Sequence, residues 1–213
     1  MFNTTETEQQ VAEFLLQIKA IKLQPNNPFT WVSGWKSPIY CDNRITLSHP
    51  TARTYIRQQL TQLIQEKFGA VGCIAGVATA GIPQGVLVAQ ELGLPFIYVR
   101  SKPKEHGRGN MIEGDVLTGK RVVVIEDLIS TGKSSLQAVE ALREAGYDVA
   151  GLAAIFTYEF DIATENFNEA KCPFVTLSNY SALIKYAEQN QYITPDDALL
   201  LKQWREAPSV WGQ

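Results

Sequence analysis

Two adjacent carboxylates, Glu126 and Asp127, follow the four branched apolar residues 122–125. Residues 128–134 come next, and among them Ser130, Thr131 and Ser134 supply hydroxyl groups at the start of a predicted helix. The backbone N–H groups at such a helix start bind phosphate. The acid pair would repel a lone phosphate. A ligand that also carries hydroxyls or a magnesium ion fits both features, and a sugar phosphate is such a ligand.

Two other interpretations of this segment fit less well. The run Gly132-Lys133-Ser134 resembles the end of a P-loop, but that motif needs a glycine at position 127, where this chain has Asp127. A nucleotide triphosphatase is therefore disfavoured. The acids could also be surface residues before an ordinary capped helix. Two acids after an apolar run, followed at once by small and loop residues, argue against that.

A second segment, residues 100–110, is rich in basic groups and should form an exposed, mobile loop after a strand. Its basic or titratable residues are Arg100, Lys102, Lys104, His106 and Arg108. A solvated basic loop is the alternative interpretation. In a chain of negative net charge, the position of these groups at a strand end favours binding of a multiply charged leaving group such as pyrophosphate.

A third segment, residues 76–83, joins a strand to a helix almost entirely through small residues. Gly76 and Gly81 would let the backbone approach an anion, as a second phosphate cradle requires. Close packing of the helix on the strand explains the glycines equally well. Both interpretations remain open at the level of sequence.

These segments need a scaffold, and the apolar pattern predicts an α/β fold with a doubly wound, mostly parallel sheet. Residues 122–125 show no polar alternation, so both faces of their strand should be covered by helices. In such a sheet ligands bind beyond the carboxyl ends of the strands, which directs attention to residues 76–81, 100–114 and 126–134. The predicted helices span 6–21, 50–68, 81–92 and 133–146; the predicted strands span 71–77, 96–100, 121–127, 149–158 and 173–177, with a hairpin over 28–46.

Composition and length limit the domain organisation and the classes of partner that the protein can have. The chain has 213 residues and 19 Lys and Arg against 22 Asp and Glu, so no global positive field attracts nucleic acid or anionic lipid. No apolar run reaches the length of a membrane span, and the polar N-terminus does not resemble a signal peptide. We expect one cytoplasmic domain over residues 1–213 with no nucleic-acid or membrane partner. Its three cysteines, Cys41, Cys73 and Cys172, fit neither a disulfide framework nor a zinc site.

The apolar strand, acid pair and Ser-Thr-Gly loop over residues 122–134 resemble the signature of the type I phosphoribosyltransferases. Residues 29–40 and 100–107 also resemble elements of the members of that family that act on orotate, namely the N-terminal base-binding element and the catalytic loop. The resemblance covers nearly the whole chain. It implies transfer of 5-phosphoribose from phosphoribosyl pyrophosphate (PRPP) to orotate, with release of pyrophosphate, in pyrimidine (UMP) biosynthesis. It also implies Mg²⁺ bound mainly through PRPP, and a homodimer with shared active sites in which residues 1–46 form a small hood over the base.

The resemblance assigns roles residue by residue. It implies that Lys104, Asp127 and His106 are catalytic and that Ser130 contacts orotate. It also implies a PRPP-binding set: Arg100, Lys104, His106, Glu126, Asp127, Leu128, Ile129, Ser130, Thr131, Gly132, Lys133 and Ser134. Within this set the basic residues would face pyrophosphate, the acids the ribose hydroxyls, and residues 130–134 the 5-phosphate.

Some positions depart from the family pattern, chiefly around the base. Val32 stands where many members have a lysine, and Tyr158 stands near the place of an orotate-binding arginine. Ala80 replaces a lysine found in some pyrophosphate cradles. Lys36 and Arg44 are the alternative cations for the carboxylate of orotate.

Two other functions share the motif at 122–134. A purine or uracil phosphoribosyltransferase should lack the patterns at 29–44 and 100–106. A PRPP-sensing regulator usually has a DNA-binding module, and the first 50 residues show no helix-turn-helix pattern or basic stripe.

Overall fold

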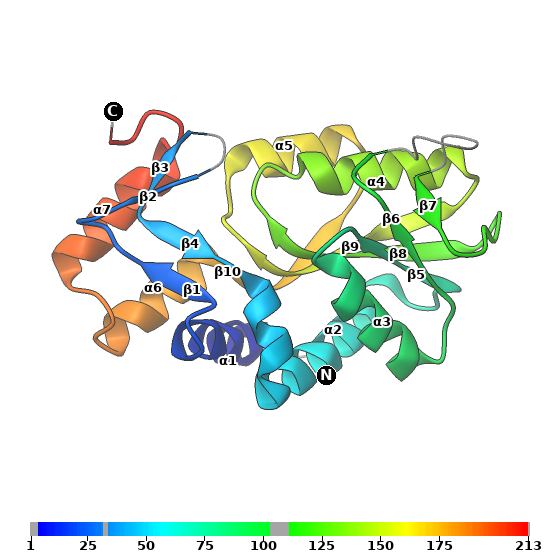
Figure 1. The fold of residues 1–213 in the computed structure, drawn as a ribbon, viewed down its shortest axis with the longest axis horizontal. Coiled ribbons are helices and arrows are strands. Elements are labelled where there is room, and N and C mark those ends of the chain that lie inside the picture. The colour runs from blue at the N-terminus through cyan, green and yellow to red at the C-terminus, as the bar shows by residue number, and fades with distance from the viewer. Residues whose placement is uncertain (1–3, 32–33, 103–110, 213) are drawn as a thin grey trace.

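The computed structural model describes residues 4–31, 34–102 and 111–212, and its centre is a six-stranded sheet (Figure 1). The strand order is β10-β9-β8-β5-β6-β7. All neighbouring pairs are parallel except β6 and β7. The strands are β5 (Cys73–Val77), β6 (Phe96–Val99), β7 (Ile112–Glu113), β8 (Arg121–Ile129), β9 (Asp148–Thr157) and β10 (Phe174–Asn179). The predicted α/β fold with a mostly parallel sheet is confirmed.

Helices cover both faces of this sheet (Figure 1). On one face lie α1 (Thr4–Gln17), α2 (Pro50–Phe68) and α3 (Gly81–Leu92); on the other lie α4 (Lys133–Glu144) and α5 (Asp161–Glu169). Successive residues of β8 alternate between the two layers. Val123 and Ile125 join the core with α1, α2 and α3, whereas Val122 and Val124 join the core with α4 and α5. The missing polar alternation in this strand thus reflects its double coverage.

A smaller unit lies beside the sheet at the left of Figure 1 and contains the N-terminal strands and the last helices. Strand β1 (Ile21–Leu23) pairs with β4 (Ile39–Cys41), and β2 (Phe29–Thr30) pairs with β3 (Lys36–Ser37). The helices are η1 (Asn43–Ser48), a 3-10 helix, and α6 (Tyr180–Gln189) and α7 (Pro195–Glu206). We call β1–β4 and η1 the hood.

The C-terminal helix α7 supports the hood through one tryptophan. Trp204 has no exposed surface, and its indole N–H donates to the carbonyl of Lys36 at 3.2 Å. Its ring packs at 5.6 Å from Trp31 and 5.7 Å from Tyr158. Trp204 therefore anchors α7 to the hood.

Several predicted boundaries were wrong. The first helix ends at Gln17 rather than 21, because Lys19 adopts a left-handed φ of 59° and turns the chain, so that Ile21 pairs with Cys41 in a strand. Strand β8 continues past residue 127 to Ile129. The prediction also missed β7 and all three helices after residue 160.

Two predicted absences can be compared with the described residues. In that part of the chain no helix is both long and apolar enough to cross a bilayer. Cys41, Cys73 and Cys172 are all free thiols.

Candidate active site

The described parts of the three segments whose residues could bind a ligand, 76–81, 100–114 and 126–134, meet at one edge of the sheet. From β5 the chain leaves to β6 on one side and later returns to β8 on the other, so β5 and β8 flank the topological switch point where α/β sheets bind ligands. In the register, Gly76 pairs with Ile125 and Val77 pairs with Val99. Residues 78 and 100 therefore leave the sheet at nearly the level of Glu126 and Asp127, where β8 loses its pairing with β5 but continues alongside β9. The sequence correctly predicted that these three segments share an edge.

Glu126 is buried at this edge, with 6% of its surface exposed. Its two carboxylate oxygens accept hydrogen bonds from the backbone N–H of Asp127 and from the hydroxyl of Ser135, each at 3.1 Å. Burial raises the pKa of Glu126 well above its ordinary value, and the neighbouring charge of Asp127 raises it further. A buried, anion-rich position of this kind favours a partner that donates hydrogen bonds.

Asp127 faces the hood. Burial raises the pKa of its carboxyl, and the nearby positive charge of Arg44 offsets part of that rise. The carbonyl of Asp127 accepts a hydrogen bond from the side-chain amide of Asn43 at 2.7 Å. The acid pair is thus held between α4, through Ser135, and the hood, through Asn43. The interpretation as two surface acids is wrong for Glu126.

The buried charge of Glu126 leads to a stability prediction. We expect Glu126→Gln to raise the thermal midpoint at pH 8, because the amide can accept from Asp127 N–H and donate to Ser135 without a charge. The raised folded-state pKa means that the wild-type protein loses stability as the pH rises from 4.5 through that pKa. Calorimetric midpoints of the two proteins should differ most at pH 8 and converge below pH 4.5. Equal midpoints at pH 8 would contradict this account.

The turn after β8 presents a helix start without a side-chain cap. Gly132, at the N-cap of α4, has a left-handed φ of 78°, and as a glycine it has no side chain to cap the first N–H groups of the helix. A Cβ on Gly132 would lie 2.6 Å from the ring of Phe167, so the position requires glycine for two reasons. Lys133 and Ser134 are exposed at this helix start. The arrangement leaves N–H groups available to an anion, as the sequence predicted.

The glycines of residues 76–83 serve helix packing in this structure. A Cβ on Gly76 would lie 2.9 Å from the carbonyl oxygen of Gly81, and a Cβ on Gly81 would collide with the carbonyl oxygen of Ile125. These contacts let α3 lie directly on β5 and β8. The Ala78–Thr79 peptide is cis. Packing therefore accounts for the two glycines, and a second phosphate cradle remains a prediction.

Arg100 stands at the base of the basic loop. Its backbone N–H donates to the carbonyl of Met111 at 2.8 Å, and its guanidinium lies 3.6 Å from the carboxylate of Glu113. The two ends of the loop therefore meet at the edge of the sheet that carries the acid pair. Lys104 and His106 lie outside the described residues, as does Val32 in the hood.

A buried aromatic cluster around Tyr158 packs against the hood near Asp127. Tyr158 is 2% exposed, and its ring lies 5.3 Å from that of Trp31 and 5.5 Å from that of Phe160. Burial raises the pKa of its hydroxyl well above the usual value, and the charges of Cys41 and Asp127 add to this. Where the resemblance expects an arginine, this chain thus has an uncharged ring in a hydrophobic cluster.

Of the two alternative cations, the structure places only Arg44 beside the acid pair. Its guanidinium is paired with Asp42 at 2.7 Å, is 62% exposed, and lies close enough to Asp127 to interact with its charge. The ammonium of Lys36 instead donates to the hydroxyl of Thr30 within the β2–β3 hairpin, at 2.9 Å. Asn43 was not among the predicted site residues, since no local sequence pattern marks an amide that donates to a backbone carbonyl 84 residues away.

The described residues contain no group of three or more acidic, histidine or cysteine side chains able to hold a metal ion. The two carboxylates of Glu126 and Asp127 alone do not form a dedicated metal cage. They are compatible with an ion that takes most of its ligands from a phosphorylated substrate and water, as Mg²⁺ does.

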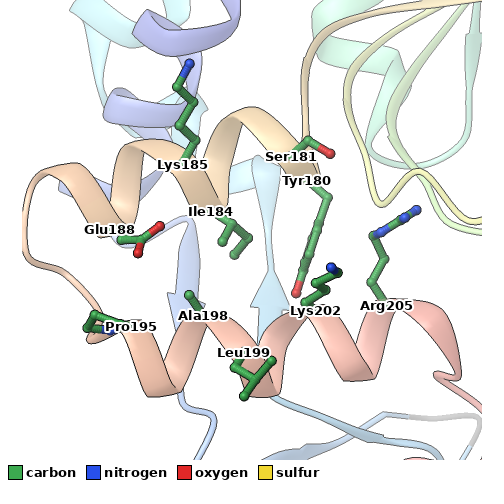
Figure 2. Close-up of a pocket in the computed structure, with 10 residues that line it drawn as sticks. All are labelled: Tyr180, Ser181, Ile184, Lys185, Glu188, Pro195, Ala198, Leu199, Lys202 and Arg205. Atoms are coloured by element: carbon green, nitrogen blue, oxygen red, sulfur yellow. The ribbon is translucent and has the colours of Figure 1, made fainter.

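A separate groove of about 540 Å³ lies between α6 and α7 (Figure 2). Its lining comes from these two helices rather than from the strand ends, and Figure 2 shows Ile184 and Ala198 between them. Arg205 at its edge donates to the carbonyl of Glu159 at 2.8 Å, and the carboxylate of Glu159 accepts from Ser181 at 2.6 Å. These contacts hold the turn after Tyr158, so Arg205 and Ser181 have a structural role.

Comparison with known proteins agrees with the geometry. Residues 47–189 match the phosphoribosyl transferase domain. The chain is 58% identical to an orotate phosphoribosyltransferase of Phocaeicola vulgatus over 204 residues, 96% of each protein. It is 56% identical to that of Listeria innocua over 206 residues, which cover 97% of this chain and 99% of the other.

Solved structures show the same fold. Leishmania donovani UMP synthase matches with a TM-score of 0.79 and 25% identity, over 93% of this chain and 42% of that one. The orotate phosphoribosyltransferase of Aeropyrum pernix matches with a TM-score of 0.73 and 26% identity, over 86% and 99% of the two chains.

Proposed function

The chain belongs to the orotate phosphoribosyltransferases of the phosphoribosyl transferase family, and we propose that its acid pair and the start of α4 form the PRPP site. The reaction transfers 5-phosphoribose from PRPP to orotate and gives orotidine 5'-monophosphate and pyrophosphate. The observation that carries the site assignment is the pair of buried Glu126 and half-buried Asp127 beside a helix start whose N-cap is a glycine. One end of this site accepts hydrogen bonds and the other donates them, as a sugar phosphate requires.

Within this site the acids bind the ribose and the turn binds the phosphate. Asp127 is the more accessible acid and accepts from the ribose hydroxyls, while Glu126, already bonded to Ser135, lies behind it. The N–H groups and hydroxyls of residues 130–134 receive the 5-phosphate. Leu128 and Ile129 link the two parts as the last residues of β8.

The chemistry needs no covalent nucleophile. Departure of pyrophosphate leaves a ribosyl cation-like state, so the chain must hold the sugar in place and accept charge on the leaving group. Asp127 orients the sugar through its hydroxyls. Arg100, Lys104 and His106 are proposed to face the pyrophosphate, with Lys104 taking the developing charge. His106 is proposed to donate a proton or a hydrogen bond.

The donor set fits the Mg²⁺ that the family uses. The ion, when bound, would neutralise charge on the pyrophosphate. The substrate's oxygens would supply most of its ligands, since the described residues form no group of three or more acidic, histidine or cysteine side chains able to hold a metal ion.

Orotate carries a carboxylate, and we propose Arg44 as its partner together with Ser130 as a contact to the base. Arg44 is the cation whose charge reaches Asp127, and its bond to Asp42 holds the guanidinium in place. The hydrogen bond of Lys36 to Thr30 directs that ammonium within the hairpin. The rings of Trp31 and Tyr158 form the apolar support of the hood behind them.

This assignment predicts different effects for two cation substitutions. Arg44→Gln should raise the KM for orotate by about tenfold, because a charged hydrogen bond contributes about 1.5–3 kcal/mol. The matched variant Lys36→Gln should leave that KM within about twofold. Initial rates at saturating PRPP measure both values. A larger effect at Lys36 than at Arg44 would reverse the assignment.

The function itself is tested with a panel of bases. With PRPP and Mg²⁺, orotate should be consumed and adenine, hypoxanthine and uracil should not. Absorbance spectra and pyrophosphate release report turnover. Equal turnover of any of the three other bases would favour the purine or uracil alternative and leave the PRPP site unaffected.

We also propose that residues 1–213 act as one domain and that the protein is a homodimer with shared active sites. The proposal rests on the resemblance and on the position of the loop's two ends, Arg100 and Met111, at the rim of the site. A loop that starts there can close over its own site or over that of a partner.

A further inference from the structure

Strand β8 extends beyond its neighbour at the active site. The pairs between β5 and β8 end at Gly76 and Ile125, whereas β8 continues to Ile129 alongside β9. Glu126 and Leu128 pair with Ala154 and Phe156 of β9. The acid pair therefore lies on a stretch of strand that β5 no longer supports.

At Asp127, where β5 has ended, side chains rather than a neighbouring strand form hydrogen bonds with the free side of the backbone. Its backbone N–H donates to the carboxylate of Glu126 at 3.1 Å, and its carbonyl accepts from the amide nitrogen of Asn43 at 2.7 Å. Asn43 is 1% exposed, so its amide cannot exchange the bond to Asp127 for a bond to water without opening the hood. A buried carbonyl left without a donor would be unfavourable.

The amide of Asn43 is itself fixed from several sides. Its oxygen accepts from the thiol of Cys41 at 3.4 Å, which leaves its nitrogen to face the carbonyl. The backbone carbonyl of Asn43 accepts from the hydroxyl of Thr46 at 2.6 Å, and that hydroxyl accepts from the amide of Gln84 on α3 at 3.2 Å. The donor is therefore held by both the hood and the sheet's helix layer.

We propose that Asn43 is a positioning residue for PRPP: its amide fixes the backbone of Asp127 and so holds the acid pair in the orientation that receives the ribose hydroxyls. The inference rests on the proposed role of the acid pair. It also gives the hood a second task besides covering the base, because the 3-10 helix that begins at Asn43 joins the base side of the site to the sugar side.

The test is a double-mutant cycle in the full-length protein. Asn43→Leu removes the donor with little change of shape and adds no charge. Titration calorimetry with PRPP and Mg²⁺ should show a dissociation constant about tenfold higher than wild type. In an Asp127→Asn background the same substitution should change it by less than about twofold, because the carboxylate that it positions is gone.

The matched control is Asn26→Leu. Asn26 is an exposed amide before β2 that donates to Asp197 at 2.9 Å, far along the chain from the acids, and its loss should leave PRPP binding unchanged. If Asn43→Leu does not fold, Asn43→Ser replaces it, since the shorter hydroxyl cannot reach the carbonyl.

Three outcomes would overturn the proposal. Unchanged PRPP binding in the Asn43 variant, with weaker binding in Asp127→Asn, rejects the positioning role alone. A full tenfold effect that persists in the Asp127→Asn background shows a general structural role instead. Unchanged binding in Asp127→Asn rejects the acid-pair assignment, and the inference with it.

Discussion

Replacing both acids, by Glu126→Gln with Asp127→Asn, is expected to lower kcat/KM for PRPP by roughly a thousandfold while the protein stays folded. Each charged hydrogen bond that is lost contributes about 1.5–3 kcal/mol, and every 1.4 kcal/mol is a factor of ten. The folded state should not suffer, because burial already penalises both charges and the amides retain the shape.

The measurement needs both activity and stability. Thermal midpoints with and without PRPP should show a variant at least as stable as wild type that PRPP no longer stabilises. A variant that still gains stability from PRPP would place the sugar elsewhere. A variant that unfolds at a much lower temperature would show that the pair is structural.

Lys104→Ala is expected to lower kcat by a factor on the order of a hundred to a thousand, with little change in the KM for orotate. The ammonium is proposed to act on charge that develops as pyrophosphate departs, and removal of one such group from an electrostatic site has effects of this size. Steady-state kinetics with both substrates separate the two parameters. An effect confined to the KM for orotate would remove Lys104 from the catalytic role.

The same variant tests whether sites are shared between subunits. If the loop crosses to a partner, each site takes Lys104 from one chain and Asp127 from the other. Mixing Lys104→Ala chains with Asp127→Asn chains then yields hybrid dimers in which one site has both defects and the other has none. With random pairing, activity should recover to about a quarter of wild type. No recovery, once mass spectrometry shows subunit exchange, would mean closure within one chain.

Local pattern was sufficient for the central strands and for the edge that carries the site. Val122–Ile125 form a run of branched apolar residues, which favours a strand covered on both faces, and parallel strands place their carboxyl ends together. The acid pair and the Ser-Thr-Gly turn could therefore be assigned to one ligand from their order along the chain. The hydrogen-bonding capacity of these residues follows from their side-chain types, which can be read directly from the sequence.

Contacts between distant segments could not be predicted in this way. The first helix ends at Gln17 because the chain turns at Lys19 to let β1 pair with β4, whose partner residues lie 16 to 20 positions away in the chain. The helix α7 begins at a local signal, the capping box of Thr194 and Asp197, but its place in the fold is set by Trp204, which packs against Trp31 and donates to Lys36. That packing against the hood could not be predicted from local periodicity.

The sequence by itself determined which groups are available and which of them leave the sheet together, since strand period and parallel topology are local and repetitive properties. Only the tertiary structure decided how those groups are held. It buried Glu126 against Ser135, brought Arg44 rather than Lys36 toward Asp127, and supplied the amide of Asn43 where β5 ends. The physical reason is that burial, charge and backbone hydrogen bonding at a site depend on residues 9 to 84 positions apart, and no local pattern records such distances.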